Sequence, residues 1–135
     1  MTGSGAALPL KLSVLPGTMC IARLPPDAVL PDWVPEAAWC SITRTAEELS
    51  IVCEAVHVPP NVRQQGGWRL LQVAGPLDFA LTGVLHRIAA PMADAGVSIF
   101  ALSTFDTDYV LVSEAELGVA VSRLRKSGII VSEPV

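Results

Sequence analysis

The sequence predicts an α+β fold in which two helices cover one face of a four-stranded antiparallel sheet. Two observations in the second half of the chain support this prediction. Two segments carry apolar residues at helical spacing, and short aliphatic segments typical of strands flank and separate them. The resulting order, strand–helix–strand–strand–helix–strand, is the split βαββαβ or ferredoxin-like arrangement. Hydrophobic residues make up 51% of the 135 residues, which is enough to fill a core.

The first half of the chain predicts short strands that are separated by turns. Pro16-Gly17 and Pro25-Pro26 end the first two strands, and the following residues 27–37 leave room for a loop or one helical turn. Thr45 and Glu48 fit a capping box with about one turn of helix. The polar, glycine-rich segment 61–67 is the best internal boundary. The strands are expected at residues 10–15, 19–24, 38–45 and 49–54.

The second half supplies the two helices. Asp78 is a candidate N-cap of the first helix, Pro91 should bend its last turn, and Gly96 should end it. Ser113 and Glu116 fit a capping box for the second helix, which ends at Gly128. The apolar positions of the two helices are Leu81, Val84, Leu85, Ile88 and Met92, then Leu117, Ala120, Val121 and Leu124. Strands are expected at residues 68–74, 97–104, 107–113 and 129–132.

The two halves also resemble each other. Residues 41–54 align without a gap on residues 101–114 at an offset of 60, and SVLPG at 13–17 is similar to QVAGP at 72–76. This similarity predicts two related units, a degenerate one at residues 8–60 and a complete one at residues 68–132. Chance similarity of two apolar hairpins is the alternative.

Composition excludes several classes of function. A net charge of −4 argues against a nucleic-acid partner, and no apolar stretch is long enough to span a membrane, so a cytoplasmic protein is expected. Three cysteines without CxxC spacing predict neither a disulfide framework nor a zinc site; they are interpreted as small buried hydrophobic residues. Cofactor-binding glycine motifs and nucleophile motifs are absent, so we expect no cofactor and no catalytic residues.

The repeat, the segment 75–114 and the capped helix after it resemble the ACT-domain family. The likeness covers residues 8–132 and is greatest to small bacterial tandem-ACT proteins and to the ACT repeats of cytosolic arginine sensors. The resemblance implies the βαββαβ fold and a regulatory role. It also implies that an amino acid binds at an interface between two such units.

The resemblance further implies the residues of a ligand site. The loop from Gly75 to Gly83 matches the ligand-facing turn of the family, and free amides at a helix start suit a carboxylate. Asp108 matches a position where the arginine sensors hold an acid near the ligand. Leu81 departs from them, because they carry an acid two places before the helix glycine, and this weakens arginine as the ligand. The candidate site residues are Asp78, Gly83, Ser103, Thr104, Thr107 and Asp108.

Each of these residues also has a purely structural explanation. Ser, Thr and Asp favour turns, Asp78 could only cap its helix, and Gly83 could serve close packing. Three functions therefore stay open. The first is a non-enzymatic regulatory protein, a homo-oligomer that binds an amino acid at a unit interface. The second is an oligomerisation or protein-interaction module without a small ligand, and the third is an unrecognised enzyme.

Overall fold

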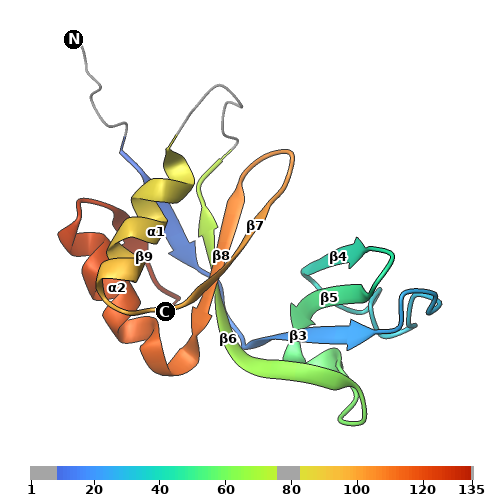
Figure 1. Cartoon of the computed structure of the whole chain (residues 1–135). Coiled ribbons are helices and arrows are strands. Elements are labelled where there is room, and N and C mark those ends of the chain that lie inside the picture. The colour runs from blue at the N-terminus through green and yellow to red at the C-terminus, as the bar shows by residue number, and fades with distance from the viewer. Residues whose placement is uncertain (1–8, 76–82, 135) are drawn as a thin grey trace. The chain divides into compact units, whose positions relative to one another are not determined.

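The computed structural model describes residues 9–75 and 83–134, and these divide into two compact units (Figure 1). The middle unit is Gly17–Trp68, and the C-terminal unit combines the chain up to Pro16 with the chain from Arg69 onward. The predicted boundaries at 8–60 and 68–132 differ from this division at the N-terminal end. Residues 9–16 belong with the C-terminal unit because their strand pairs there.

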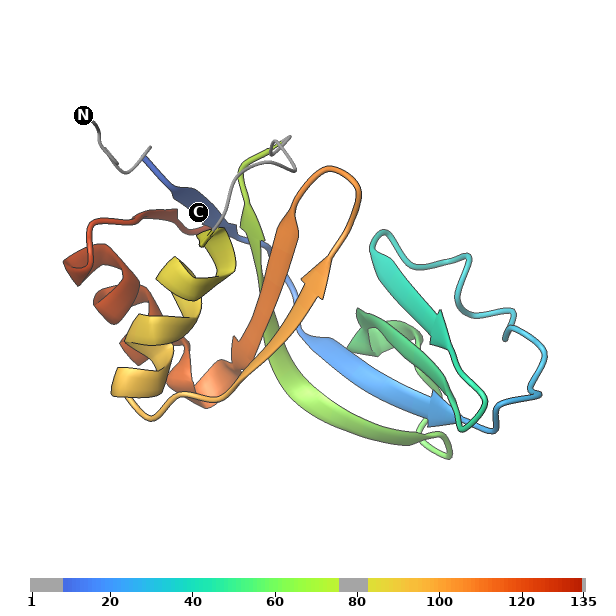
Figure 2. The ribbon, with the colours of Figure 1, turned by 45° about the horizontal axis from the view of Figure 1, so that its top comes forward.

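The C-terminal unit is a sheet with two helices on one face. In chain order it contains β2 (Lys11–Val14), part of β6 (Arg63–Val73), α1 (Val84–Asp94), β7 (Ile99–Ser103), β8 (Asp108–Ser113), the 3₁₀ turn η2 (Glu114–Glu116), α2 (Leu117–Lys126) and β9 (Ile130–Ser132). The strand order is β7–β8–β6–β2–β9. Helices α1 and α2 lie side by side on the same face (Figures 1 and 2). The predicted βαββαβ order from β6 to β9 is confirmed.

The sheet differs from the predicted four-stranded antiparallel one. Strand β2 pairs antiparallel with β6 and parallel with β9, so it separates the first and last strands of the βαββαβ unit. Leu12 lies opposite Val73 on one side and Val131 on the other, and all three side chains are buried in one cluster. Burial of this apolar row stabilises the inserted strand, since apolar area removed from water contributes about 25 cal/mol per Å².

The helices bury most of the apolar positions that their sequences predict, but Leu85 of α1 is exposed. Ile88 and Met92 of α1 are buried, and so are Ala120, Val121 and Leu124 of α2. They pack on a cluster that also contains residues of β2, β6, β8 and β9. Pro91 lies inside α1, and Gly96 follows its end with a φ of 72°. This core holds both helices on the sheet and thereby fixes where α1 begins.

The start of the second helix is formed differently from the prediction. Ser113 makes no side-chain capping hydrogen bond, so the predicted capping box with Glu116 is wrong. The 3₁₀ turn η2 comes first, and α2 begins only after Glu116. The acids at 114 and 116 still lie at the positive end of the helix dipole, where negative charge is favourable.

The middle unit consists of strands and turns. It contains β3 (Met19–Leu24), β4 (Cys40–Arg44), β5 (Leu49–Glu54), the 3₁₀ turn η1 (Ala55–His57) and the first residues of β6, in the order β4–β5–β3–β6. All of residues 17–68 are described, and none is in an α-helix. The segment 61–67, predicted as a boundary, is mostly strand: Arg63, Gln64 and Gln65 pair with β3, and an irregularity follows.

The turn between β4 and β5 is a hairpin turn and contains no helix. The amide of Thr45 donates to the carbonyl of Glu48 over 2.9 Å, which closes the turn. Thr45 Oγ1 accepts the amides of Glu47 and Glu48, each at 3.1 Å. The predicted Thr45-to-amide contact is therefore present, but it organises a β-turn, as Thr side chains commonly do.

Two of the three cysteines lie where they were predicted. Cys20 and Cys53 are fully buried, whereas Cys40 is exposed, so the expectation fails for Cys40. Cys53 lies opposite both others across neighbouring strands. The pKa of Cys53 is raised to about 12, mainly by burial of its thiol. The nearby thiols of Cys20 and Cys40 and the Glu54 carboxylate add to this rise. All three cysteines are free thiols.

Candidate functional site

The candidate site lies at one end of the C-terminal unit. The last residues of β6, the start of α1 and the turn between β7 and β8 all reach this end (Figures 1 and 2). The topology explains the convergence, because β6 leads toward α1 and the hairpin turns beside the end of β6. We call Ser103–Asp108 together with Val73, Ala74 and Gly75 the hairpin site.

The base of the hairpin is a polar cross-strand pair. Ser103 and Asp108 are directly opposite each other, and the Ser103 hydroxyl donates to Asp108 Oδ1 over 2.7 Å. This bond holds one carboxylate oxygen and leaves capacity on the group, since an ionised carboxylate accepts about four hydrogen bonds. Asp108 is half-buried and Asp106 is exposed, so the turn presents two acids.

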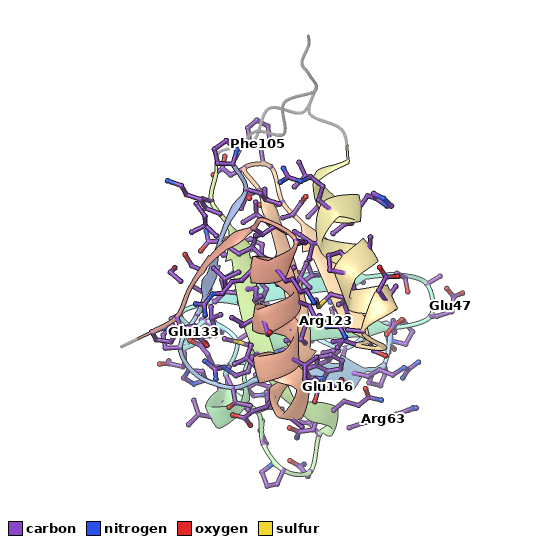
Figure 3. The ribbon with its side chains drawn as sticks, turned by 90° about the vertical axis from the view of Figure 1, so that its left-hand side faces the viewer. Glu47, Arg63, Phe105, Glu116, Arg123 and Glu133 are labelled. Atoms are coloured by element: carbon purple, nitrogen blue, oxygen red, sulfur yellow. The ribbon has the colours of Figure 1, made fainter. Side chains whose placement is uncertain are left out.

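The tip of the hairpin is an ordered turn. The amide of Thr104 donates to the Thr107 carbonyl over 2.8 Å, and the Thr104 hydroxyl donates to the same carbonyl over 3.1 Å. Thr104 Oγ1 lies 3.3 Å from the Thr107 amide, which donates to it. Phe105, at the tip, has 81% of its surface exposed (Figure 3). Turn chemistry thus accounts for Thr104.

Thr107 fastens the hairpin to β6. Thr107 is only 5% exposed and is the one buried polar residue among those the structure describes. Its hydroxyl donates to the Val73 carbonyl over 2.7 Å. Gly75 lies two residues after Val73, and a Cβ on Gly75 would come within 3.0 Å of the Asp106 carbonyl oxygen. The hairpin therefore lies directly against the residues that lead toward α1.

Gly83 is the residue before the first turn of α1. Its φ is 76°, in the left-handed region that glycine adopts at no steric cost, and its carbonyl accepts the Arg87 amide over 2.9 Å. The structure thus requires glycine here for backbone reasons, and none of the described side chains caps this end of α1. Asp78 and Leu81 lie outside the described residues.

The structure brings together four of the six predicted site residues, Ser103, Thr104, Thr107 and Asp108, in one hydrogen-bonded turn. Of these, Asp108 is the charged side chain with capacity for a ligand, and Thr107 is a positioning residue. The contact between Gly75 and the hairpin, and the role of the Val73 carbonyl, were not predicted from the sequence. A glycine directly after an apolar strand was the available signal, since it permits close approach of a second backbone.

No metal centre is evident in this part of the molecule. Among residues 9–75 and 83–134, no three His, Cys, Asp or Glu side chains are arranged to hold a metal ion. In the same residues, the helices are too short to cross a membrane.

Comparison with known proteins relates this fold to a family. Residues 64–126 match the family model of the ACT domain, and residues 17–61 match a separate model of an N-terminal domain. The chain therefore contains an ACT domain, as the resemblance in its sequence predicted. The first match covers most of the C-terminal unit, and the second falls within the middle unit.

Particular proteins are similar to this chain in sequence or structure. A crystal structure of a protein from Agobacterium tumefaciens is 36% identical, with a TM-score of 0.89 over 96% of both chains. The mouse protein named "Cytosolic arginine sensor for mTORC1 subunit 1" is 37% identical over 60 residues, or 44% of this chain. Those residues are 18% of that sensor, so the chain matches about a fifth of the length of this curated relative.

A more distant structure shows the fold alone. The aspartate kinase of Clostridium acetobutylicum, described as an allosteric enzyme, is 9% identical with a TM-score of 0.62. The match covers 88% of this chain and 34% of the kinase. The ferredoxin-like fold of ACT domains is thus shared at very low sequence identity.

Proposed function

We propose that this chain is a small regulatory protein that binds an amino acid at the hairpin site, with Asp108 pairing the cationic group of the ligand. The observation that carries the proposal is the Asp108 carboxylate, which Ser103 holds in place at the turn of an ACT domain. The sequence likeness to a protein named as an arginine sensor supports an amino acid as the class of ligand.

The chemistry of the site fits an amino acid. A carboxylate held by one hydrogen bond forms strong charge-assisted bonds with an ammonium or guanidinium group. The start of α1 lies at the same end of the unit, where free backbone amides and the helix dipole favour the carboxylate of a ligand (Figure 1). The proposal includes the other predicted site residues, with Asp78 and Gly83 on the side of the helix start. It assigns no catalytic residue.

The proposal extends to organisation and location. The similar hairpins of the two units support a tandem ACT arrangement in which the first unit is degenerate. We expect a homo-oligomer, because ACT-type sheets offer edges for pairing. We also expect a cytoplasmic protein, in line with the name of the mouse relative. Neither a cofactor nor a nucleic acid is part of the proposal.

A thermal-shift screen against the twenty amino acids tests the function. A ligand at 100 times its Kd stabilises the folded state by about 2.7 kcal/mol, which gives a clear rise in Tm. Asp108→Asn should abolish the rise for the selected amino acid. Asp106→Asn is the matched control, because it removes the same charge from the exposed tip of the same turn. It should keep at least most of the rise.

The outcomes separate the candidate functions. A rise that Asp108→Asn retains would overturn the site, and a flat response by well-folded protein would overturn amino-acid binding. The interaction module would then be favoured by two features. Within the described residues β7 pairs only with β8, and the large Phe105 side chain is exposed at the tip. Light scattering of wild-type protein would then be expected to show a homodimer.

A further inference from the structure

The outer face of the C-terminal unit contains a groove between α1 and α2 that the hairpin site does not use. Its volume is about 460 Å³, within the range of small-molecule sites. The residues that line it come from α1, from the end of α2 and from the turn after α2: His86, Arg87, Ala90, Pro91, Asp94, Arg123, Lys126, Ser127 and Ile129.

Positive charge is concentrated in this groove. The chain has nine Lys and Arg residues and a net charge of −4, yet Arg87, Arg123 and Lys126 line one groove whose single acid is Asp94. Two helices contribute the cations, so the cluster is a product of the fold. The dipole of α2 favours cations in its own last turn, but it does not call for Arg87 on the neighbouring helix.

Two of these cations have no structural task in the described residues. Four other arginines donate hydrogen bonds to backbone carbonyls: Arg23, Arg44, Arg69 and Arg125. Arg123 and Lys126, by contrast, have neither a hydrogen bond nor an ion pair with any residue that the structure describes.

The neighbouring Arg125 shows the difference clearly. It donates to the Val131 carbonyl over 2.7 Å and lies 3.6 Å from the Glu133 carboxylate. Figure 3 shows Glu133 on one side of α2 and Arg123 on the other, toward α1. The acid that neutralises the end of α2 is thus on the far side from the groove, and the groove keeps its positive charge.

The floor of the groove is apolar. Ile129 is buried, and Ala90 and Pro91 are half-buried. A ligand that fits both features has a compact anionic group for the cations and a short apolar body for the floor. A phosphate monoester carries close to two negative charges and three acceptor oxygens at neutral pH. Arg recognises phosphate through a fork of N–H donors, and Lys does so as a point charge.

We propose that the α1–α2 groove is a binding site for a phosphate-bearing small molecule, held by Arg87, Arg123 and Lys126. The site shares no residue with the hairpin site, so a second ligand would reach the same ACT unit independently of any amino acid. The contact is non-covalent and requires no metal.

The test is an NMR titration of the full-length protein with phenyl phosphate, inorganic phosphate and benzoate. Backbone amide shifts are followed up to about 10 mM ligand, which detects a Kd near 1 mM. Phenyl phosphate should bind most tightly, with saturable shifts centred on residues 86–94 and 123–129. Inorganic phosphate should bind more weakly because it lacks the apolar body, and benzoate weakest because it has one charge.

Charge-matched variants complete the test. The double variant Arg123→Gln, Lys126→Gln should weaken phenyl phosphate about tenfold or more, as expected when two charge-assisted contacts are lost. The control Lys11→Gln, Arg63→Gln removes the same charge from exposed positions on β2 and β6 and should change the Kd less than about twofold. The proposal would be overturned if phenyl phosphate did not saturate, or if its shifts lay outside the groove. It would also be overturned if benzoate bound as tightly as phenyl phosphate, or if both double variants lost the same affinity.

Discussion

Replacement of Gly75 by alanine probes the packing that holds the hairpin site together. A Cβ at this position would lie 3.0 Å from the Asp106 carbonyl oxygen, 3.0 Å from Thr107 Cβ and 3.3 Å from Thr107 Oγ1. Ordinary contacts between carbon atoms are about 3.5–4.0 Å. All three neighbouring atoms belong to the backbone or to a stiff β-branched side chain, so the hairpin must move as a body.

The size of the effect follows from two opposing terms. Overpacking of this kind costs about 1–3 kcal/mol, whereas alanine in place of glycine reduces the entropy of the unfolded chain by about 0.4–1 kcal/mol. We therefore expect Gly75→Ala to lower the free energy of unfolding by about 1–2 kcal/mol. Gly66→Ala is the matched control, because the nearest atom to its new Cβ is Cys20 Cβ at 4.0 Å. Its stability should be unchanged or slightly higher.

Urea unfolding of both variants, followed by circular dichroism, measures the difference. Close packing at Gly75 would be contradicted if Gly75→Ala were as stable as the wild type, or if Gly66→Ala lost as much stability. The same variant links stability to function. A displaced hairpin moves Asp108, so Gly75→Ala should also weaken the amino-acid response in the thermal-shift screen, and Gly66→Ala should not.

Two further predictions concern single side chains. Thr107→Val removes the 2.7 Å hydrogen bond to the Val73 carbonyl at nearly constant volume and should lower the free energy of unfolding in urea by about 1–2 kcal/mol. The control Thr43→Val, on exposed β4, should stay within about 0.5 kcal/mol of the wild type. Equal effects of the two variants would contradict the role given to Thr107. The pKa of Cys53 in the folded protein, about 12, lies above that of the thiol in the unfolded chain. Between these two values the folded protein retains a proton that the unfolded chain loses. The free energy of unfolding should therefore fall as pH rises from about 9 toward 12. In Cys53→Ala the free energy of unfolding should fall less steeply with pH, by up to about 1.4 kcal/mol per pH unit. Coincident pH profiles of wild type and variant would show that the buried thiol does not contribute.

Much of the C-terminal unit was predictable because its signals are local. Helical spacing of apolar residues located both helices, and Gly96 marked the end of the first one. The capping box at Ser113 failed because a 3₁₀ turn precedes α2, and no local pattern distinguishes these two starts. The place of β2 between β6 and β9 could not be read locally either, since it depends on pairing between residues more than a hundred positions apart.

Alignment of the two halves found the similar hairpins but placed them one residue out of register. Thr45 and Thr104 begin equivalent turns, and each accepts an amide three residues on through its Oγ1. These residues are 59 apart, whereas the sequence alignment used 60. A one-residue shift exchanges the two faces of a strand, so the alignment paired Glu48 with Asp108 although the turns match Glu48 with Thr107.

This shift bears on the candidate site. In the structural correspondence, the residue of the middle unit that matches Asp108 is Leu49, which is fully buried. The two hairpins therefore share a turn but differ at the position of Asp108, the half-buried carboxylate of the C-terminal hairpin. If the units are related by duplication, a charge for ligand binding is present in only one of them. The hairpin site should then bind one ligand per chain, and calorimetry of the selected amino acid should give a stoichiometry of one. A stoichiometry of two would instead require a second site that does not depend on an acid at this position.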